Sequence, residues 1–499
     1  MGAVPVPPLL QTDALARLRE ALEGFTPDSV LSVLGPVGQS ALDRGDLVGA
    51  ERALPDGGPL ATLVRLFLLD REVPEAAALA AVGSLDPGLF DVVAGRVRAR
   101  FEVRPYGEQD GPAWWVVSDF GSDVRPGPLE QDHVLGIGAA SLTLAQVTMR
   151  RPVGRALDVG TGCGIQALHL SRHADAVTAT DLSARALAMA ATTAALSGVR
   201  WDLRQGSLLE PVAEERYDLI VANPPFVVSP GLSAGAGGGY DYRDSGLAGD
   251  GVCHALLTGL PSRLAPGGTA QLLANWVITA EQAWDERLAG WLDGSGCDAW
   301  VWQREVAGPG EYVSLWLRDA GEQPGTDRWR RRYTEWTDWM AGAGILGVGM
   351  GVVSLWNSGS GAPVVVCEDV PQPVDQPAGP AIAQWLPRQH WLRDSSDLDL
   401  LAAPLRCAGG LVRVRHDLRG ACGWQTELEQ LRLSDGMRWQ VEADAAIAGL
   451  VGACDGTVPL AVLVRTLATA MGAGEDEVSE AVIPVVRDLI SRGILLPPG

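Results

Sequence analysis

The chain has 499 residues, of which 47% are hydrophobic and 20% are charged. This composition is ordinary for globular proteins and excludes a disordered or collagen-like chain, and the length suits about two to four domains. All 39 basic residues are arginine, and the net charge of −22 argues against a protein that coats nucleic acid through a general basic surface.

The seven cysteines are an odd number and form no CxxC pair, which argues against a disulfide framework and against a zinc site. The N-terminal residues lack a basic segment followed by an apolar core, so we expect no targeting signal. The longest apolar run, Ala341–Val353, is too short to span a bilayer. We therefore expect a cytoplasmic protein without a membrane segment or bound metal, and the sequence predicts no oligomeric state.

Residues 1–100 are predicted to form a small helical N-terminal domain, because helical periodicity runs from about residue 12 onwards and continues through Pro59–Leu69. Two winged-helix-like interpretations remain open, a nucleic-acid reader and a scaffold over a site, and the scaffold is favoured. Residues 101–150 are predicted to link this domain to the next one. The link would consist of a β-hairpin that includes Ala113–Ser118 and a helical stretch from His133 to Met149.

Residues 151–356 are predicted to form the central domain. From about residue 151 to residue 320, strand and helix patterns alternate, which predicts a parallel sheet with helices on both faces. The candidate strands are Ala156–Val159, Ala176–Thr180, Tyr217–Ala222 and Thr269–Ala274. Ala299–Gln303 and Tyr312–Leu317 flank a Gly-Pro-Gly turn, which predicts an antiparallel hairpin that closes the sheet. Asp327–Met340 is predicted to be an amphipathic helix. Its arginines and aromatic residues could bind RNA or a peptide, but the interpretation as a packing helix is favoured.

Residues 357–380 are rich in Gly, Pro and Ser, so we expect a linker there. Residues 381–499 are predicted to form a winged-helix-like α+β domain. Its predicted elements are a strand at Leu411–His416 and helices at Ala443–Cys454, Pro459–Met471 and Asp476–Ser491. Residues 444–493 hold seven acids and three arginines, a balance of −4, which disfavours a DNA-reading helix and favours protein contact or substrate positioning.

A glycine-rich turn, Asp158-Val159-Gly160-Thr161-Gly162-Cys163-Gly164, lies between the first strand of the central region and a predicted helix. Glycines permit both a sharp turn and the close approach of a ligand. Asp181 follows the next strand, where a carboxylate can accept both hydroxyls of a ribose. Ser183 is predicted to cap helix 184–197, which Gly198 ends. Dinucleotide oxidoreductases carry a similar arrangement but usually show GxGxxG, whereas this spacing is Asp-x-Gly-x-Gly-x-Gly.

The turn resembles that of class I S-adenosylmethionine-dependent methyltransferases. The resemblance implies a Rossmann-like α/β sheet and S-adenosyl-L-methionine as cofactor, with glycines beside the methionine part, Asp158 orienting its amino group and Asp181 holding the ribose. The implied cofactor-binding residues are Asp158, Gly160, Thr161, Gly162, Gly164, Asp181, Leu182, Ser207 and Asn223.

Two positions depart from this family. Ser207 follows Gly206 where an acid commonly binds the adenine amine, and Thr192-Thr193 stand where the preceding helix often carries an asparagine. Cys163 is interpreted as a small buried residue, because no basic partner lies nearby in the sequence.

Asn223-Pro224-Pro225-Phe226 follows strand Tyr217–Ala222, at the carboxyl end where open α/β sheets bind ligands. The prolines remove two donors, so the carbonyl of the first one is available as an acceptor. This carbonyl and the Asn side-chain oxygen can accept both hydrogens of one planar NH2 group, which directs the nitrogen lone pair at an electrophile. Phe226 offers a face on which a flat group can stack.

The tetrapeptide resembles the Asn/Asp-Pro-Pro-aromatic motif of methyltransferases that act on planar nitrogen. These include adenine and guanine enzymes of nucleic acids and the glutamine enzymes that modify release factors. The resemblance implies catalytic roles for Asn223, Pro224, Pro225 and Phe226. A glycine-rich loop at Gly231–Gly239 is a candidate lid, and Arg243, Asp244 and Asp250 are secondary candidates for substrate contact.

Three functional hypotheses result. The first is methyl transfer from S-adenosylmethionine to a planar nitrogen, with an RNA or DNA base favoured over protein glutamine. The second is glutamine methylation of a protein, which suits the acidic flanking domains. The third, from another class, is a protein that binds the cofactor without catalysis. The resemblance covers about residues 133–320, so we expect substrate choice to reside in the flanks, which contact a nucleic acid or protein that carries a planar amine.

Overall fold

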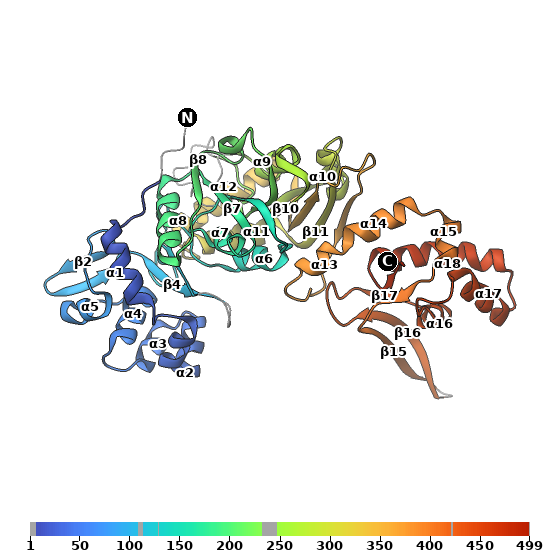
Figure 1. Cartoon of the computed structure of the whole chain (residues 1–499), viewed down its shortest axis with the longest axis horizontal. Helices are drawn as coiled ribbons and strands as arrows, with labels where there is room; N and C mark the ends of the chain where they lie inside the picture. Colours follow the sequence, from blue (N-terminus) through green and yellow to red (C-terminus); the bar gives the residue numbers. More distant parts are fainter. Residues whose placement is uncertain (1–5, 108–112, 128, 232–246, 421–422, 499) are drawn as a thin grey trace. The chain divides into compact units, whose positions relative to one another are not determined.

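The computed structural model describes residues 6–107, 113–127, 129–231, 247–420 and 423–498. The chain divides into two compact units. The first consists of residues 1–145 and 151–369, and the second of residues 146–150 and 370–499. Figure 1 labels many of their helices and strands. Within the described ranges, every helix is too short or too polar to cross a membrane.

The N-terminal part of the first unit combines five helices with a small antiparallel sheet of order β1-β3-β2. Its elements are α1 (Thr12–Leu22), α2 (Pro27–Asp43), α3 (Leu47–Ala53), α4 (Pro59–Phe67), β1 (Val73–Pro74), α5 (Glu75–Val82), β2 (Phe90–Val93) and β3 (Arg96–Ala99). The prediction of helices throughout residues 12–100 is therefore wrong for the three strands. In β3, Val97 and Ala99 are buried while Arg96 and Arg98 are exposed, which is the period of two of a strand.

The predicted hairpin is present as β4 (Glu102–Tyr106) and β5 (Trp114–Ser118), which pair antiparallel. It is fastened to helix α8 (Ala184–Ser197), because the Val117 N–H donates to Thr193 Oγ1 at 3.0 Å. Leu9 N donates to the neighbouring Thr192 Oγ1 at 2.9 Å. The two threonines that depart from the family pattern therefore anchor the N-terminal part of the chain to the central region.

The central region is built on an eight-stranded sheet of order β13-β11-β12-β10-β9-β6-β7-β8, in which β12 alone runs antiparallel to its neighbours. The strands are β6 (Val153–Val159), β7 (Ala174–Asp181), β8 (Asp202–Gln205), β9 (Tyr217–Ala222), β10 (Leu264–Thr279), β11 (Asp298–Ala307), β12 (Ile345–Trp356) and β13 (Val365–Asp369). The other helices are α6 (Ala139–Val147), α7 (Ile165–Leu170), α9 (Gly251–Gly259), α10 (Trp284–Leu292), α11 (Pro309–Asp319) and α12 (Asp327–Gly342), with short 3-10 turns at Glu210–Val212 and Leu260–Arg263. This confirms the predicted Rossmann-like α/β fold, and all four candidate strands are present.

Two expectations for this region are wrong. Tyr312–Leu317 lies in helix α11, not in a strand, because Pro309 occupies the first turn and Tyr312, Val313 and Leu317 are buried along one helical face. The predicted linker at 357–380 is wrong for residues 365–369, which form β13 and pair parallel with β11. The two compact units nevertheless divide directly after this strand, inside the predicted linker. The apolar run of this strand stands inside a segment whose overall composition is typical of a loop.

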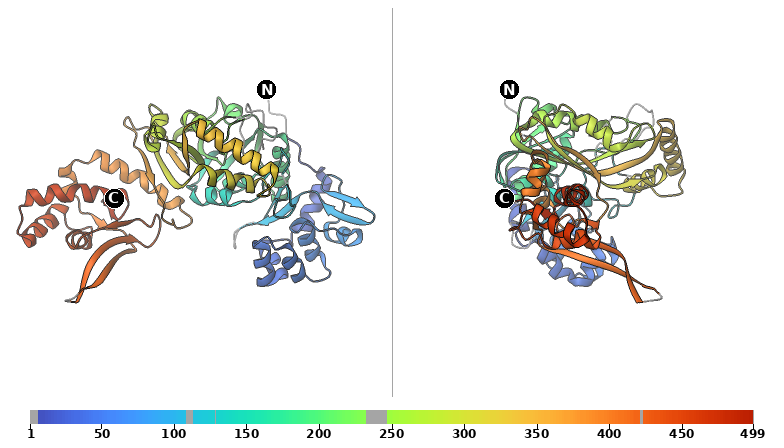
Figure 2. Two further views of the ribbon diagram at one scale, coloured as in Figure 1. Left: turned by 180° about the vertical axis from the view of Figure 1, so that it is seen from behind. Right: turned by 90° about the vertical axis from the view of Figure 1, so that its right-hand side faces the viewer.

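The predicted helix at Asp327–Met340 is confirmed as α12, and its aromatic residues pack inward. Trp329, Trp336 and Met340 are buried in a cluster with Tyr312 of α11. Figure 2 shows α12, coloured yellow to gold, lying along the sheet in the rear view. The aromatic residues of α12 thus serve the packing role that the sequence favoured.

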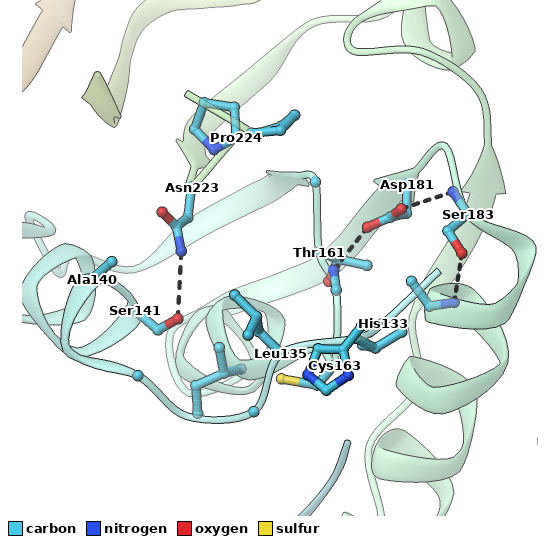
Figure 3. A pocket seen from close by; sticks show the side chains of 18 of the residues that line it. His133, Leu135, Ala140, Ser141, Thr161, Cys163, Asp181, Ser183, Asn223 and Pro224 are labelled. Atoms are coloured by element: carbon cyan, nitrogen blue, oxygen red, sulfur yellow. Dashed lines mark hydrogen bonds between the residues drawn. The ribbon is translucent and has the colours of Figure 1, made fainter. Parts of the chain in front are cut away.

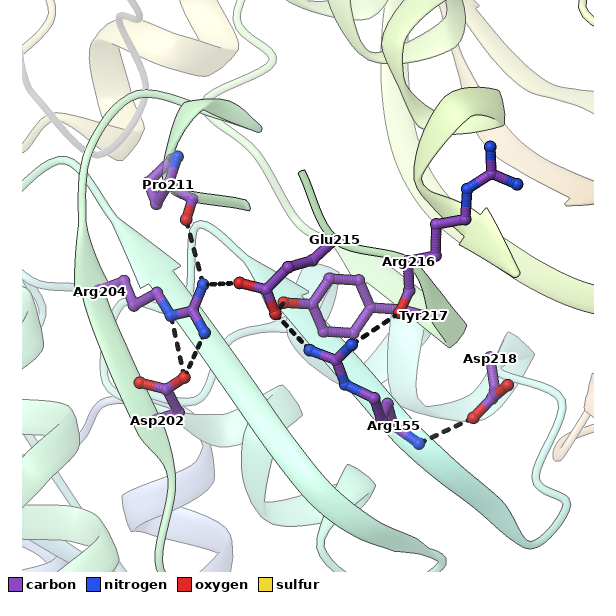
Figure 4. A network of polar contacts seen from close by, with 8 residues as sticks. All are labelled: Arg155, Asp202, Arg204, Pro211, Glu215, Arg216, Tyr217 and Asp218. Carbon is purple, nitrogen blue, oxygen red and sulfur yellow. Dashed lines mark hydrogen bonds and ion pairs between the residues drawn. The ribbon is translucent and has the colours of Figure 1, made fainter. Parts of the chain in front are cut away.

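An ion-pair network fastens the sheet at the amino ends of β6 and β9 (Figure 4). Arg204 of β8 binds Asp202 at 2.6 Å and also pairs with Glu215, which pairs in turn with Arg155 of β6. The Arg155 N–H donates to Asp218 Oδ2 at 2.8 Å. The hydrogen bond from Arg204 lowers the pKa of Glu215. These charges stabilise the strand ends opposite the edge that carries the candidate motifs.

The second unit contains helices and short antiparallel sheets of order β15-β16-β17 and β14-β18. Its elements are α13 (Gly379–Ala383), α14 (Trp385–Asp394), α15 (Asp397–Ala402), β14 (Arg406–Cys407), β15 (Leu411–Gly420), β16 (Gly423–Leu433), β17 (Gln440–Glu442), α16 (Ala445–Gly452), α17 (Leu460–Met471), α18 (Glu475–Ser491) and β18 (Leu495–Leu496). The three predicted C-terminal helices are confirmed as α16–α18, and the predicted strand at Leu411–His416 is part of β15.

Candidate functional site

A cavity of about 590 Å³ lies at the carboxyl ends of the central strands. Its lining includes Gly160–Cys163 after β6, Asp181 and Leu182 at the end of β7, and Asn223–Phe226 after β9. Figure 3 shows side chains from all three segments around this space. Open α/β sheets bind their ligands at this edge, and the volume falls within the range of about 300–1,000 Å³ that is usual for small-molecule sites.

The glycine turn leaves room for a ligand at one position and packs tightly at another. Gly162 has φ +53°, and a Cβ added there would have no heavy atom within 4 Å. Gly164 does not line the cavity: an added Cβ would lie 2.6 Å from the Trp201 ring. An added Cβ at Gly160 would lie 3.7 Å from the Asn223 carbonyl oxygen, so the turn runs next to the Asn-Pro-Pro-Phe segment.

Asp158 lies beneath the turn and not in the cavity wall. It is fully buried, and its Oδ2 accepts hydrogen bonds from Thr161 Oγ1 at 2.6 Å and from Ala167 N at 3.1 Å. Its Oδ1 has no hydrogen-bond partner among the described residues. Burial raises the pKa of Asp158 to about 7. The direct contacts of this carboxyl group therefore fix Thr161 and the first turn of α7.

Asp181 is placed to receive hydroxyl groups. Its Oδ2 accepts from Gly162 N and its Oδ1 from Ser183 N, both at 2.9 Å. An ionised carboxylate offers about four acceptor positions, and Asp181 lines the cavity. Leu182 is 58% exposed and lines the cavity beside Asp181, and Ser207 lines it after β8.

Asn223 is oriented by a residue that has no predicted role. Its Nδ2 donates to Ser141 Oγ at 3.4 Å, as drawn in Figure 3. The Ser141 carbonyl accepts from Gln166 Nε2 at 2.6 Å, and both of these residues are buried. With its amide nitrogen engaged, Asn223 has its side-chain oxygen available as an acceptor. Ser141 falls within a predicted helical stretch, and only its position next to the strand edge identifies it.

The Asn-Pro-Pro-Phe segment forms the other side of the cavity. Pro224 and Pro225 line it, and neither can donate a backbone hydrogen bond. Phe226 faces Trp316 of α11, with ring centroids 6.0 Å apart and ring planes at 68°. Trp316 also lines the cavity, and the sequence assigned it to a strand. Recognising the helical spacing of Tyr312, Val313, Trp316 and Leu317 identifies this residue.

Among the described residues that line the cavity, acids outnumber arginines: the acids are Glu102, Asp119, Asp123, Asp132, Asp181 and Asp319, and the one arginine is Arg104. Glu102 pairs with Arg104, and Asp119 pairs with Arg185, both at 2.5 Å. Burial lowers the pKa of His133, which favours its neutral form. Such a lining favours a cationic ligand over an anionic one.

The segment from His133 to Gly138 precedes α6 and lines the cavity without being helical, so the predicted helical stretch 133–149 is confirmed only for Ala139–Val147. Cys163 is buried, and burial raises the pKa of its thiol to about 12, which keeps it protonated. Among the described residues, no group of three His, Cys, Asp or Glu side chains is arranged to hold a metal ion.

Asp250 has a structural position. It is buried, accepts from Val277 N at 3.0 Å and pairs with Arg287 at 2.6 Å. These bonds fix the start of α9 against β10. Arg243 and Asp244, and the glycine loop beyond residue 231, lie outside the described residues.

Comparison with known proteins agrees with this geometry. Residues 135–236 match the family model described as "Methyltransferase small domain". The matched segment contains the glycine turn, Asp181 and Asn223–Phe226. Two further models, each described as a domain of unknown function, match residues 22–100 and 383–497.

Three similar curated proteins illustrate the range of relatives. "Release factor glutamine methyltransferase" of Bordetella pertussis is 36% identical over 149 residues, which cover 28% of this chain and 51% of the relative. "Ribosomal protein uL3 glutamine methyltransferase" of Bradyrhizobium diazoefficiens is 32% identical, with coverages of 34% and 54%. "Ribosomal RNA small subunit methyltransferase C" of Klebsiella pneumoniae is 27% identical, with coverages of 38% and 51%. The chain thus spans about half the length of the curated relatives it matches.

One similar solved structure is a T. thermophilus 16S rRNA N2 methyltransferase in complex with AdoMet and guanosine. It is 19% identical, with a TM-score of 0.26, and the match covers 51% of this chain and 66% of that one.

Proposed function

We propose that this protein is an S-adenosylmethionine-dependent methyltransferase that transfers a methyl group to a planar nitrogen. The observation that carries the proposal is the meeting of three features in one cavity: the open glycine turn, the ribose-type acceptor Asp181 and the acceptor pair at Asn223 and Pro224. A nicotinamide oxidoreductase has no use for the last of these.

The residues present fit the cofactor. The open space at Gly162 suits the methionine part, Asp181 would hold the ribose, and Leu182 and Ser207 would contact the adenine. The acidic lining suits a ligand that carries both a sulfonium and an ammonium group. When bound, S-adenosylmethionine supplies an electrophilic methyl group.

The chain's own contribution to the reaction is positioning and charge stabilisation. The Asn223 side-chain oxygen and the Pro224 carbonyl would accept the two hydrogens of the acceptor amine, which aims its lone pair into the cavity. These bonds strengthen as positive charge builds on the nitrogen, so they stabilise the transition state more than the bound substrate. Correct orientation of the two reactants can contribute about 7–11 kcal/mol.

Two acceptors fit this chemistry, a nucleic-acid base and the side-chain amide of a protein glutamine. The sequence motifs slightly favour a base, but the acidic lining disfavours the phosphates that flank one. We therefore propose protein glutamine as an equal candidate, in agreement with the names of two relatives. The N-terminal domain would serve as a scaffold for the cavity wall. The C-terminal domain would contact a protein or position the substrate. The location that we propose for the protein is the cytoplasm.

Calorimetry with S-adenosylmethionine and with NAD tests the cofactor assignment. We expect the first to bind and the second not to bind; the reverse would refute the proposal. Transfer of a labelled methyl group into a cell lysate, followed by separate nuclease and protease digestion, then identifies the acceptor polymer. Label that is already in a small molecule before either digestion would exclude both candidates.

A further inference from the structure

The cavity has a second aromatic wall that lies outside the matched segment 135–236. Trp316 of α11 lines the cavity together with Phe226, and their ring planes stand at 68°. A flat group that stacks on one of these rings therefore presents its edge to the other. Both arrangements are favourable for aromatic and delocalised groups at centroid distances of about 4.5–7 Å.

Buried polar contacts hold α11 in register with the Asn-Pro-Pro-Phe segment. Tyr312, one turn before Trp316, is fully buried. Its hydroxyl accepts hydrogen bonds from Val228 N and from Asn275 Nδ2, both at 2.9 Å. The Tyr312 and Trp316 ring centroids are 6.1 Å apart. The indole is thus supported from behind by a residue that binds the backbone two positions after Phe226.

Helix α12 completes this support. Trp336 Nε1 donates to the Val228 carbonyl at 3.1 Å, and its ring meets Tyr312 edge-on at 6.4 Å. Both backbone polar groups of Val228 are therefore bound by side chains of α11 and α12. This arrangement fixes Phe226 and Trp316 relative to each other before any acceptor binds, which reduces the entropic cost of binding a flat group.

We infer that Trp316 is a specificity-determining residue of the acceptor site: with Phe226 it forms an aromatic corner that contacts the planar, delocalised acceptor group. Tyr312 and Trp336 are positioning residues, because they act through Trp316 and Val228. This inference rests on the proposed function, since it assumes that the acceptor enters beside Phe226.

Binding of two flat probes, guanosine and N-acetylglutamine N-methylamide, tests the inference in the full-length protein. The affinity for each probe is measured by saturation-transfer NMR for the wild type, Trp316→Ala and Trp316→Phe, in the absence and in the presence of S-adenosylhomocysteine. Trp339→Ala is the matched control, because Trp339 packs in the same cluster but does not line the cavity. The Kd for S-adenosylmethionine is measured separately for all four proteins.

We expect at least one probe to bind the wild type and its affinity to fall about tenfold or more in Trp316→Ala, the scale of base–aromatic stacking. Trp316→Phe should recover most of this loss, and Trp339→Ala should match the wild type. The inference is refuted if neither probe binds the wild type, if Trp316→Ala binds both probes normally, or if Trp339→Ala loses as much. Failure of the wild type to bind S-adenosylmethionine would instead refute the proposed function, so the two failures are distinguishable.

Discussion

Replacement of Asp181 by asparagine should weaken cofactor binding while leaving the fold in place. The two carboxylate oxygens accept the Gly162 and Ser183 N–H groups, each at 2.9 Å, and Asp181 lines the cavity where we propose that the ribose binds. Asparagine removes the negative charge and converts one oxygen into a donor, so one hydroxyl loses its acceptor. Such a hydrogen bond contributes about 1.5–3 kcal/mol. At 1.4 kcal/mol per tenfold change, the Kd should rise about 10- to 150-fold.

Calorimetric titration with S-adenosylmethionine measures this change. Asp175→Asn is the matched control, because Asp175 lies on the same strand, β7, at its exposed amino end. Thermal unfolding of both variants monitors the fold, and a small loss of stability is expected for Asp181→Asn because one backbone N–H loses its acceptor. A Kd within twofold of the wild type in a folded Asp181→Asn protein would refute the ribose role of this carboxylate.

Three further predictions concern turnover and stability. Asn223→Ala should reduce the rate of methyl transfer about 100- to 1,000-fold, because a hydrogen bond to the transition state is lost. The Kd for the cofactor should not change, and full turnover by this variant would contradict the proposed role of Asn223. Asp158, with its pKa raised from 3.8 to about 7, binds its proton more tightly in the folded state, so the stability of the ligand-free protein should fall by up to about 4 kcal/mol as the pH rises from 4 to 7. Urea unfolding across this range should show a flatter profile for Asp158→Asn, and equal slopes would contradict the assignment. Burial would raise the pKa of Asp70, but hydrogen bonds from Arg125 and Arg98 outweigh it and lower the pKa. Asp70→Asn should therefore cost about 2–3 kcal/mol at pH 7. This cost should shrink as the pH falls below the ordinary aspartate pKa and vanish below the lowered pKa of Asp70, so urea unfolding should show a smaller difference at pH 3 than at pH 7.

Local signals predicted the central region well. Helix α8 begins and ends as expected, because Ser183 accepts from Ala186 N and Gly198 takes the left-handed conformation at its end. The parallel strands were identified because they are buried on both faces and read as continuous apolar runs. These features depend on a few neighbouring residues, so the sequence contains the information directly.

The secondary-structure predictions are wrong where tertiary contacts decide between two possible local structures. Tyr312–Leu317 has the aromatic and β-branched composition of a strand, yet the buried hydrogen bonds that the Tyr312 hydroxyl accepts from Val228 N and Asn275 Nδ2 stabilise a helix. β13 was hidden in a proline-rich segment and is defined only by its pairing with β11.

The residues of the candidate site likewise divide into those that local motifs predict and those that only tertiary contacts reveal. The motif residues Gly162, Asp181 and Asn223 are brought together at one strand edge, as their spacing indicates. Gly164 instead packs against Trp201, and Asp250 binds Arg287. The sequence could not predict these two contacts, because each joins residues that are distant along the chain. Ser141 and Trp316 were missed for the same reason, since neither belongs to a recognisable motif.

The anchoring of the N-terminal part has a consequence for protein engineering. Asp70 binds Arg125 at 2.8 Å, close to Asp123 and Val124 of the cavity lining, and β5 covers α8 through Val117 and Thr193. A shortened protein that starts at residue 135 would keep every motif residue but lose this wall and expose the apolar surface of α8. Transplanting the motif-bearing segment alone into another protein should therefore yield an insoluble product, and the smallest transferable module includes the preceding helices and hairpin.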